Sequence, residues 1–152
     1  MNSQLEAYRK RFDSLQIRSR ELLSLCPDDR LFESITGFEV VSFGVALIRC
    51  AAEVEVVFGG ITTRLWDDPF EWTLPEQLST KSAIFAYFDE VAAMTNRGFA
   101  ALADDSVLTK IIPAPEQLKP IGEVLQNALN ASELNFELAK MGLDLLLPDD
   151  RA

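Results

Sequence analysis

The stretch from Phe43 to Leu65 constrains the fold of this chain more than any other. Within it, apolar residues follow one another at steps of three and four, the spacing of one face of an α-helix. They are Phe43, Leu47, Cys50, Val54, Val57 and Ile61. Further apolar residues between them widen this surface beyond a single face. A helix this apolar is normally covered by several neighbours, so the sequence predicts the central helix of a bundle.

The same periodicity predicts three more helices. The four expected segments are residues 2–26, 39–66, 79–103 and 120–142. Pro27 ends the first helix, Ser79 or Thr80 caps the third, and Gly142 suits the position just after the fourth. No run alternates apolar and polar residues over the length of a strand. The predicted fold is therefore an all-α four-helix bundle, with residues 1–152 as one domain.

The segments between these helices carry their own predictions. The segment WDDPFEWTLPEQLS contains two prolines and no helical period, which indicates a long ordered crossover between the second and third helices. Its Trp66, Phe70 and Trp72 are expected to lie on the bundle, because free segments rarely carry three large aromatic residues. Residues 107–119 are expected to be irregular or to hold one short turn, and residues 145–148 to fold back onto the bundle as a short apolar tail. Tyr87 falls off the apolar face of the third helix and is expected at an interface.

Charge and composition exclude several classes of partner. The chain has 14 basic and 24 acidic residues, a net charge of −10, whereas nucleic-acid binding needs clustered basic groups. No apolar run approaches the ~20 residues of a membrane-spanning helix, and the N-terminus lacks the apolar core of a secretory signal. We therefore expect a cytoplasmic protein without nucleic-acid or membrane partners. Its two cysteines, Cys26 and Cys50, are expected to be reduced.

The chain contains no histidine. This excludes a Ser-His-Asp triad, a Cys-His pair, an HExxH zinc site and the ExxH motif of di-iron bundles. Most general acid–base catalysis near neutral pH also depends on histidine. The sequence thus leans away from an enzyme, and we expect no cofactor and no metal.

Three segments together resemble the DinB/YfiT-like superfamily of four-helix bundles. They are SFGVALIRCAAEVEVVFGGI, FEWTLPEQLSTKSAIFAYFDEV and NASELNFELAKMGLD, and the resemblance extends from about Leu15 to Pro148. Members commonly hold a divalent metal between one histidine of the second helix and two, at i and i+4, of the fourth. By position these ligands correspond to Cys50, Gln126 and Asn130. Neutral amides are poor ligands for transition metals, so the resemblance implies a member that lacks the metal site. It also suggests a homodimer.

Cys50, Gln126 and Asn130 are the candidate ligand-pocket residues, and each has an ordinary structural interpretation as well. Cys50 lies on the apolar face as a core residue would, while Gln126 and Asn130 fit a solvent face. We expect a metal-free, non-catalytic module that binds a small ligand or another protein. The alternative is a transferase or hydrolase that modifies a thiol or small electrophile in a pocket formed by these three residues. A structural stress-response protein without a ligand is the third hypothesis.

Overall fold

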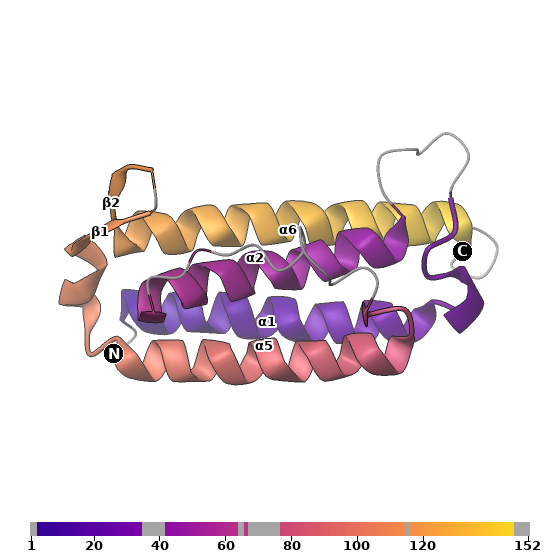
Figure 1. The fold of residues 1–152 in the computed structure, drawn as a ribbon, viewed down its shortest axis with the longest axis horizontal. Helices are drawn as coiled ribbons and strands as arrows, with labels where there is room; N and C mark the ends of the chain where they lie inside the picture. Colours follow the sequence, from indigo (N-terminus) through magenta and orange to yellow (C-terminus); the bar gives the residue numbers. More distant parts are fainter. Residues whose placement is uncertain (1–2, 35–41, 64–65, 67–76, 115, 148–152) are drawn as a thin grey trace.

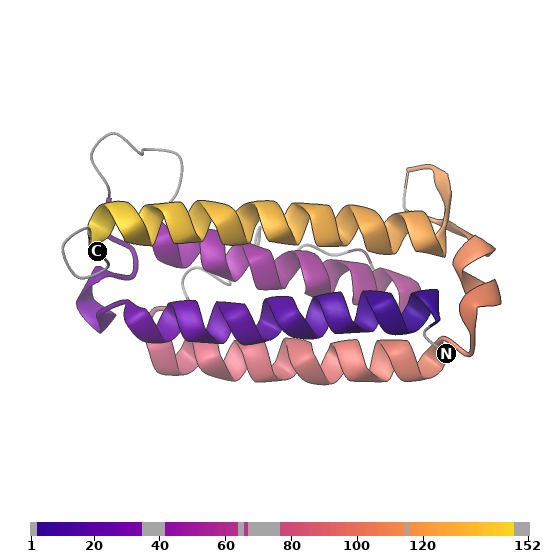
Figure 2. The same ribbon diagram turned by 180° about the vertical axis from the view of Figure 1, so that it is seen from behind.

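The chain forms four long helices that lie side by side, with a small hairpin at one end (Figures 1 and 2). The structure is a computed structural model that describes residues 3–34, 42–63, 66, 77–114 and 116–147. The elements in chain order are α1 (Gln4–Leu25), the 3₁₀ helix η1 (Asp28–Arg30), α2 (Phe43–Thr63), α5 (Lys81–Ala101), the 3₁₀ helix η2 (Asp105–Thr109), β1 (Ile111–Pro113), β2 (Leu118–Pro120) and α6 (Ile121–Leu146). The prediction of an all-α chain with four helices is confirmed.

The helices form a ring in which each packs against two neighbours. α2 lies between α5 and α6, and α1 closes the ring between the same two helices, so α1 and α2 lie diagonally and touch little. α1 and α6 run in one direction, and α2 and α5 run in the other (Figure 1). Because α2 and α5 are parallel, the chain between Thr63 and Lys81 joins opposite ends of the bundle, as the predicted crossover requires. Phe70 and Trp72 of that connection lie outside the described residues.

Several predicted boundaries differ from the structure. All four helices begin or end within a few residues of the predicted positions, and Thr80 caps α5 by accepting a hydrogen bond from the backbone N–H of Ala83. The prediction that Gly142 ends the last helix was wrong. α6 continues to Leu146 and buries Gly142, so residues 145–146 belong to the helix and form no separate tail.

The segment before α6 is more regular than predicted. Residues 107–119 were expected to be irregular or to hold one short turn. η2 supplies a short turn at their start, but β1 and β2 then pair as an antiparallel hairpin with Ile112 opposite Lys119. Tyr87 was expected off the buried face of its helix, and this too was wrong. Its side chain is 5% exposed, and its hydroxyl donates a hydrogen bond of 2.5 Å to Glu55 of α2.

Three phenylalanines from three helices meet in the core. Phe12 of α1, Phe58 of α2 and Phe99 of α5 have ring centroids 5.2–5.8 Å apart, with the rings tilted or edge-on. This is the arrangement that aromatic rings favour over face-to-face stacking. Gly98 of α5 lies directly beside the Phe58 ring, because a Cβ atom added there would be 2.3 Å from Phe58 Cδ1. The cluster therefore requires a glycine at position 98.

The start of α1 is capped from a distant part of the chain. Asp105 of η2 accepts hydrogen bonds from the backbone N–H groups of Gln4 (2.9 Å) and Leu5 (3.0 Å). Ser3 satisfies a third backbone donor, that of Glu6. A carboxylate here also interacts favourably with the positive end of the helix dipole. Asp105 thus fastens the first helix to the segment that leads into the last.

We expect Asp105 to make the free energy of unfolding depend on pH in the acidic range. The hydrogen bonds from the backbone N–H groups of Leu5 and Gln4 lower the pKa of Asp105 below its ordinary value of 3.8. Its contribution should therefore be complete above that value and lost as the pH falls through the lowered folded-state pKa. Asp105→Asn should destabilise the protein at pH 7, and this difference should shrink below about pH 4 in urea unfolding followed by circular dichroism. Asp13→Asn is the matched control, and an equal loss in both variants would contradict the prediction.

Candidate functional site

The Cys50 thiol is enclosed in the bundle. Cys50 lies in α2, exposes 2% of its surface, and has its sulfur 3.8 Å from the hydroxyl of Ser19 in α1. It lines a cavity of about 60 Å³ among α1, α2 and α5, which is room for only a few water molecules. Its backbone carbonyl accepts a hydrogen bond of 3.0 Å from Ser132 of α6. Cys50 therefore sits where a structural core residue would.

Burial also suppresses the reactivity of this thiol. Loss of solvent raises the pKa of Cys50 to about 12, although the hydrogen bond with Ser19 and the charge of Arg18 act to lower it. The thiolate is the reactive form of cysteine, and it is scarcely populated near pH 7 at such a pKa. The geometry gives Cys50 neither access to a substrate nor an activating base.

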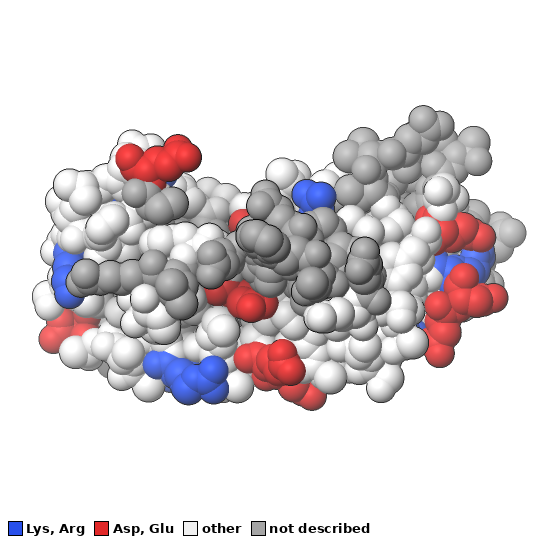
Figure 3. All heavy atoms as spheres, viewed as in Figure 1, with Lys and Arg blue, Asp and Glu red and all other residues white. Residues whose placement is uncertain are grey.

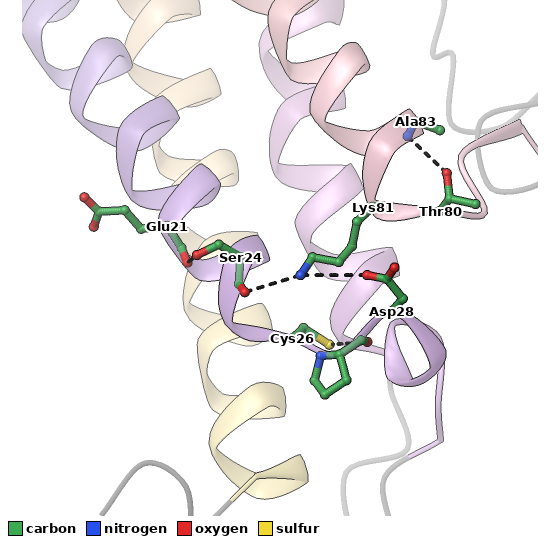
Figure 4. Close-up of polar contacts among 8 residues, drawn as sticks. Glu21, Ser24, Cys26, Asp28, Thr80, Lys81 and Ala83 are labelled. Atoms are coloured by element: carbon green, nitrogen blue, oxygen red, sulfur yellow. Dashed lines mark hydrogen bonds and ion pairs between the residues drawn. The ribbon is translucent and has the colours of Figure 1, made fainter.

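The second thiol, Cys26, is held at the end of α1 (Figure 4). It is 1% exposed, and its sulfur donates a hydrogen bond of 3.5 Å to the carbonyl of Pro27. Lys81 is the nearby cation, but its ammonium group donates to the carbonyl of Ser24 and pairs with Asp28 at 3.8 Å. Burial raises the pKa of Cys26 despite the opposing charges of Lys81 and Arg30. This cluster ties the end of α1 to the start of α5.

Both thiols should therefore resist modification in the folded protein. At pH 8 we expect Ellman's reagent to react slowly with the native chain and to release two equivalents of its coloured product once the chain is unfolded in guanidinium chloride. Ser82→Cys, which places a thiol on the exposed surface of α5, is the positive control and should add one fast equivalent. Fast labelling of Cys50, assigned by its loss in Cys50→Ala, would contradict this prediction and revive the thiol-based enzyme.

Gln126 and Asn130 lie on a different side of the bundle from the thiol cavity. The amide of Gln126 donates a hydrogen bond of 3.0 Å to Asn130 and accepts one of 3.3 Å from Arg11 of α1. Arg11 also bonds Glu133 at 3.3 Å. Gln126 lines a surface hollow of about 260 Å³ between α1 and α6, together with Arg11 and Tyr8. The structure thus brings Gln126 and Asn130 together, but it places Cys50 in a separate, buried environment.

The three residues do not fit the metal that the resemblance would imply. A thiol held in its protonated form and two amides bonded to each other make a poor ligand set for a transition metal. Among the residues that the structure describes, no group of three or more His, Cys, Asp and Glu side chains could hold a metal ion.

A different pocket opens between α2, α6 and the hairpin, and the sequence did not predict it. Its volume is about 180 Å³, and we call it the α2–α6 pocket. Each helix contributes residues at positions i, i+3 and i+4, which share one helix face. The lining residues are Glu53, Val56 and Val57 of α2, Val124, Asn127 and Ala128 of α6, Ala114 and Lys119 from the hairpin region, and Trp66.

Trp66 forms one wall of this pocket because Gly60 of α2 lets it approach. A Cβ atom added to Gly60 would be 2.3 Å from Trp66 Cδ2, so the indole lies against the helix backbone. The prediction that Trp66 lies on the bundle is confirmed. Lys119 also lines the pocket, and its side chain is half-buried. None of the ion pairs between described residues involves Lys119.

The fold and these sites define a helical bundle with a candidate binding pocket between two antiparallel helices. None of the described helices is both long enough and apolar enough to span a membrane. Lys and Arg side chains on the face shown in Figure 3 form separate patches, and no continuous basic area joins those that are coloured. No protein-family model, no curated protein and no solved structure matches this chain. The resemblance to the DinB/YfiT-like bundles stays a prediction.

Proposed function

We propose that this protein is a non-catalytic binding module, a metal-free DinB-like bundle that holds a small ligand in the α2–α6 pocket. The observation that carries the proposal is the lining of this pocket, which combines buried apolar residues and the Trp66 indole with three polar side chains, those of Glu53, Lys119 and Asn127. Ligand sites in proteins commonly combine predominantly apolar linings with a few placed polar groups, and in bundles they lie between helices. The thiol cavity offers about 60 Å³, whereas the α2–α6 pocket offers about 180 Å³.

The buried residues that line the pocket are held in place by packing in the core. Val57 and Val124 are 3% and 7% exposed, and both belong to the packed core, so they cannot turn away to collapse the space. Asn127 stands exposed at the rim. The lining of the pocket thus includes one side chain that faces solvent.

The test is a fragment screen by ligand-observed NMR against the folded chain. The probes are neutral and charged molecules of up to about 12 heavy atoms, a size at which the best ligands gain at most ~1.5 kcal/mol per atom. Asn127→Trp fills the mouth of the pocket from an exposed position and should abolish binding. Asn130→Trp changes an exposed residue of the same helix outside the pocket and should leave binding intact. Absence of any binding fragment, or equal binding to both variants, would overturn the proposal.

Association with a second copy of the chain is the other part of the proposal, and an exposed apolar stripe on α6 favours it. Leu134, Met141 and Leu145 are 62%, 51% and 52% exposed, and with the partly buried Leu138 they follow one another at steps of four, three and four. Such a stripe is the pattern with which helices pair. Sedimentation equilibrium should show a dimer, and Leu134→Asp should dissociate it. A wild-type protein that stays monomeric at all concentrations would contradict the proposed self-association.

A further inference from the structure

Lys119 brings a positive charge to the α2–α6 pocket, and nothing in the described part of the chain pairs with it. Its side chain is half-buried, yet no hydrogen bond or ion pair between described residues involves its ammonium group. Glu53, the other charged residue of the lining, already has a partner, so it does not require a cationic group from a ligand. A partly desolvated ammonium group forms its strongest hydrogen bonds with an anion. The unmet interaction in this pocket is therefore one for a negative charge.

The hairpin directs the Lys119 side chain toward the pocket. Successive residues of a strand point to opposite faces, and Leu118 points into solvent with 71% of its surface exposed. Lys119 lies opposite Ile112 of β1, and directly opposed residues of an antiparallel pair share a face. Ile112 packs against the core, so this face is the one turned toward the bundle. The pairing of β1 and β2 thus fixes the point from which Lys119 reaches the pocket.

The rest of the lining suits a compact apolar group. Val57, Val124 and Ala128 are buried, and Trp66 adds an aromatic surface. The volume of the pocket is about 180 Å³, and an apolar cavity of ~150 Å³ admits a molecule of the size of benzene. The pocket therefore has room for about six carbon atoms, with a charged end at Lys119.

We infer that the ligand is a small organic monocarboxylate with a compact apolar tail of about five carbon atoms. Its carboxylate binds the ammonium group of Lys119, and its tail packs on Val57 and Val124. One ammonium group balances one negative charge, whereas a phosphate monoester carries nearly two near pH 7 and would leave the second unpaired in a pocket that also contains Glu53. This inference rests on the proposed function, because it names the ligand class of the same pocket.

The decisive probes share one carbon skeleton and differ in charge. They are 4-methylpentanoate, the neutral 4-methylpentanamide and the cationic 4-methylpentylamine. Isothermal titration calorimetry at pH 7 should show the carboxylate binding about fivefold more tightly than the amide, which is the difference between a charge-assisted and a neutral hydrogen bond. The amine should bind more weakly than the amide, because its charge repels that of Lys119. An amide or amine that binds as tightly as the carboxylate would overturn the inference.

The contribution of the tail is tested with acetate, which keeps the charge and lacks the apolar group. Acetate should bind at least about tenfold more weakly than 4-methylpentanoate, because four fewer carbon atoms are buried. Equal binding of the two anions would show that the apolar lining does not select the ligand, and the inference would then fail.

Variants of Lys119 assign the charge preference to this residue. Lys119→Met should make 4-methylpentanoate and its amide bind alike, and Lys119→Arg, which keeps the charge, should retain the preference. Lys110→Met, at an exposed position outside the pocket, is the matched control and should leave the ratio unchanged. If the ratio is the same in Lys119→Met as in the wild type, Lys119 does not bind the carboxylate and the inference fails.

The neutral probe separates failure of the inference from failure of the proposed function. If 4-methylpentanamide binds as tightly as 4-methylpentanoate and Asn127→Trp abolishes its binding, the pocket is a binding site but the carboxylate assignment is wrong. If neither these probes nor any fragment responds to Asn127→Trp, the pocket is no binding site and both statements are wrong.

Discussion

Replacing Phe58 with alanine should lower the free energy of unfolding by about 3–5 kcal/mol, the usual cost of removing a large aromatic side chain from a core. Phe58 is fully buried, and its ring contacts those of Phe12 and Phe99 on two other helices. The substitution therefore removes both the buried apolar surface of Phe58 and its ring contacts, which join α2 to α1 and α5. Guanidinium chloride unfolding followed by circular dichroism at 222 nm measures the change.

Phe32→Ala provides the comparison for Phe58→Ala. Phe32 is 37% exposed, so its removal takes less apolar surface out of the folded state and leaves a smaller cavity. We expect Phe32→Ala to lower the free energy of unfolding by well under half as much as Phe58→Ala. If Phe58→Ala costs no more than Phe32→Ala, the aromatic cluster is not the anchor of the core.

Gly98→Ala should also destabilise the protein, although alanine is the better helix former by about 1 kcal/mol. The added methyl group would lie 2.3 Å from Phe58 Cδ1, which is too close for two carbon atoms, and Phe58 is packed on its other sides. Overpacking of this kind costs about 1–3 kcal/mol, so the clash should outweigh the gain in helix propensity. The same unfolding experiment shows whether Gly98→Ala lowers or raises the free energy of unfolding.

The physical reason for the Gly98 effect can be tested with a double-mutant cycle. Phe58→Leu shortens the side chain that the new methyl group would meet, so Gly98→Ala should cost less in the Phe58→Leu background than in the wild type. Gly122→Ala is the matched control, because its added atom would lie 3.2 Å from the nearest neighbour, the carbonyl oxygen of Leu108. A cost of Gly98→Ala that is independent of residue 58 would refute the steric explanation.

The sequence predicted the helices well because their apolar spacing is strong. The stripe that begins at Phe43 becomes the buried face of α2, with Leu47, Cys50, Val54 and Val57 all below 9% exposure. Gly142 misled the prediction because glycine ends many helices, whereas here α6 continues past a buried Gly142 to Leu146. The hairpin was missed because two strands of three residues are too short to show alternation.

The candidate site was harder to predict than the fold. Cys50 was open to two interpretations, and the structure places it as a core residue would be placed. The α2–α6 pocket draws on two helices, a hairpin and Trp66, and no spacing along the chain links such distant segments. Asn127, which lines it, is adjacent to the predicted Gln126 but points about 100° away around the helix. Adjacent residues of α6 therefore line two different surfaces, the α2–α6 pocket and the hollow between α1 and α6.

The diagonal placement of α1 and α2 has a consequence for how the chain is made. These two helices are synthesised first, yet they touch little, and each makes most of its helix contacts with α5 and α6. Contacts that hold α1, such as the bonds from Gln4 to Asp105 and from Tyr8 to Gly122, join residues 101 and 114 positions apart. Such long separations slow folding. A nascent chain that has emerged only through Thr63 therefore lacks the two helices that cover most of the apolar surface of α1 and α2.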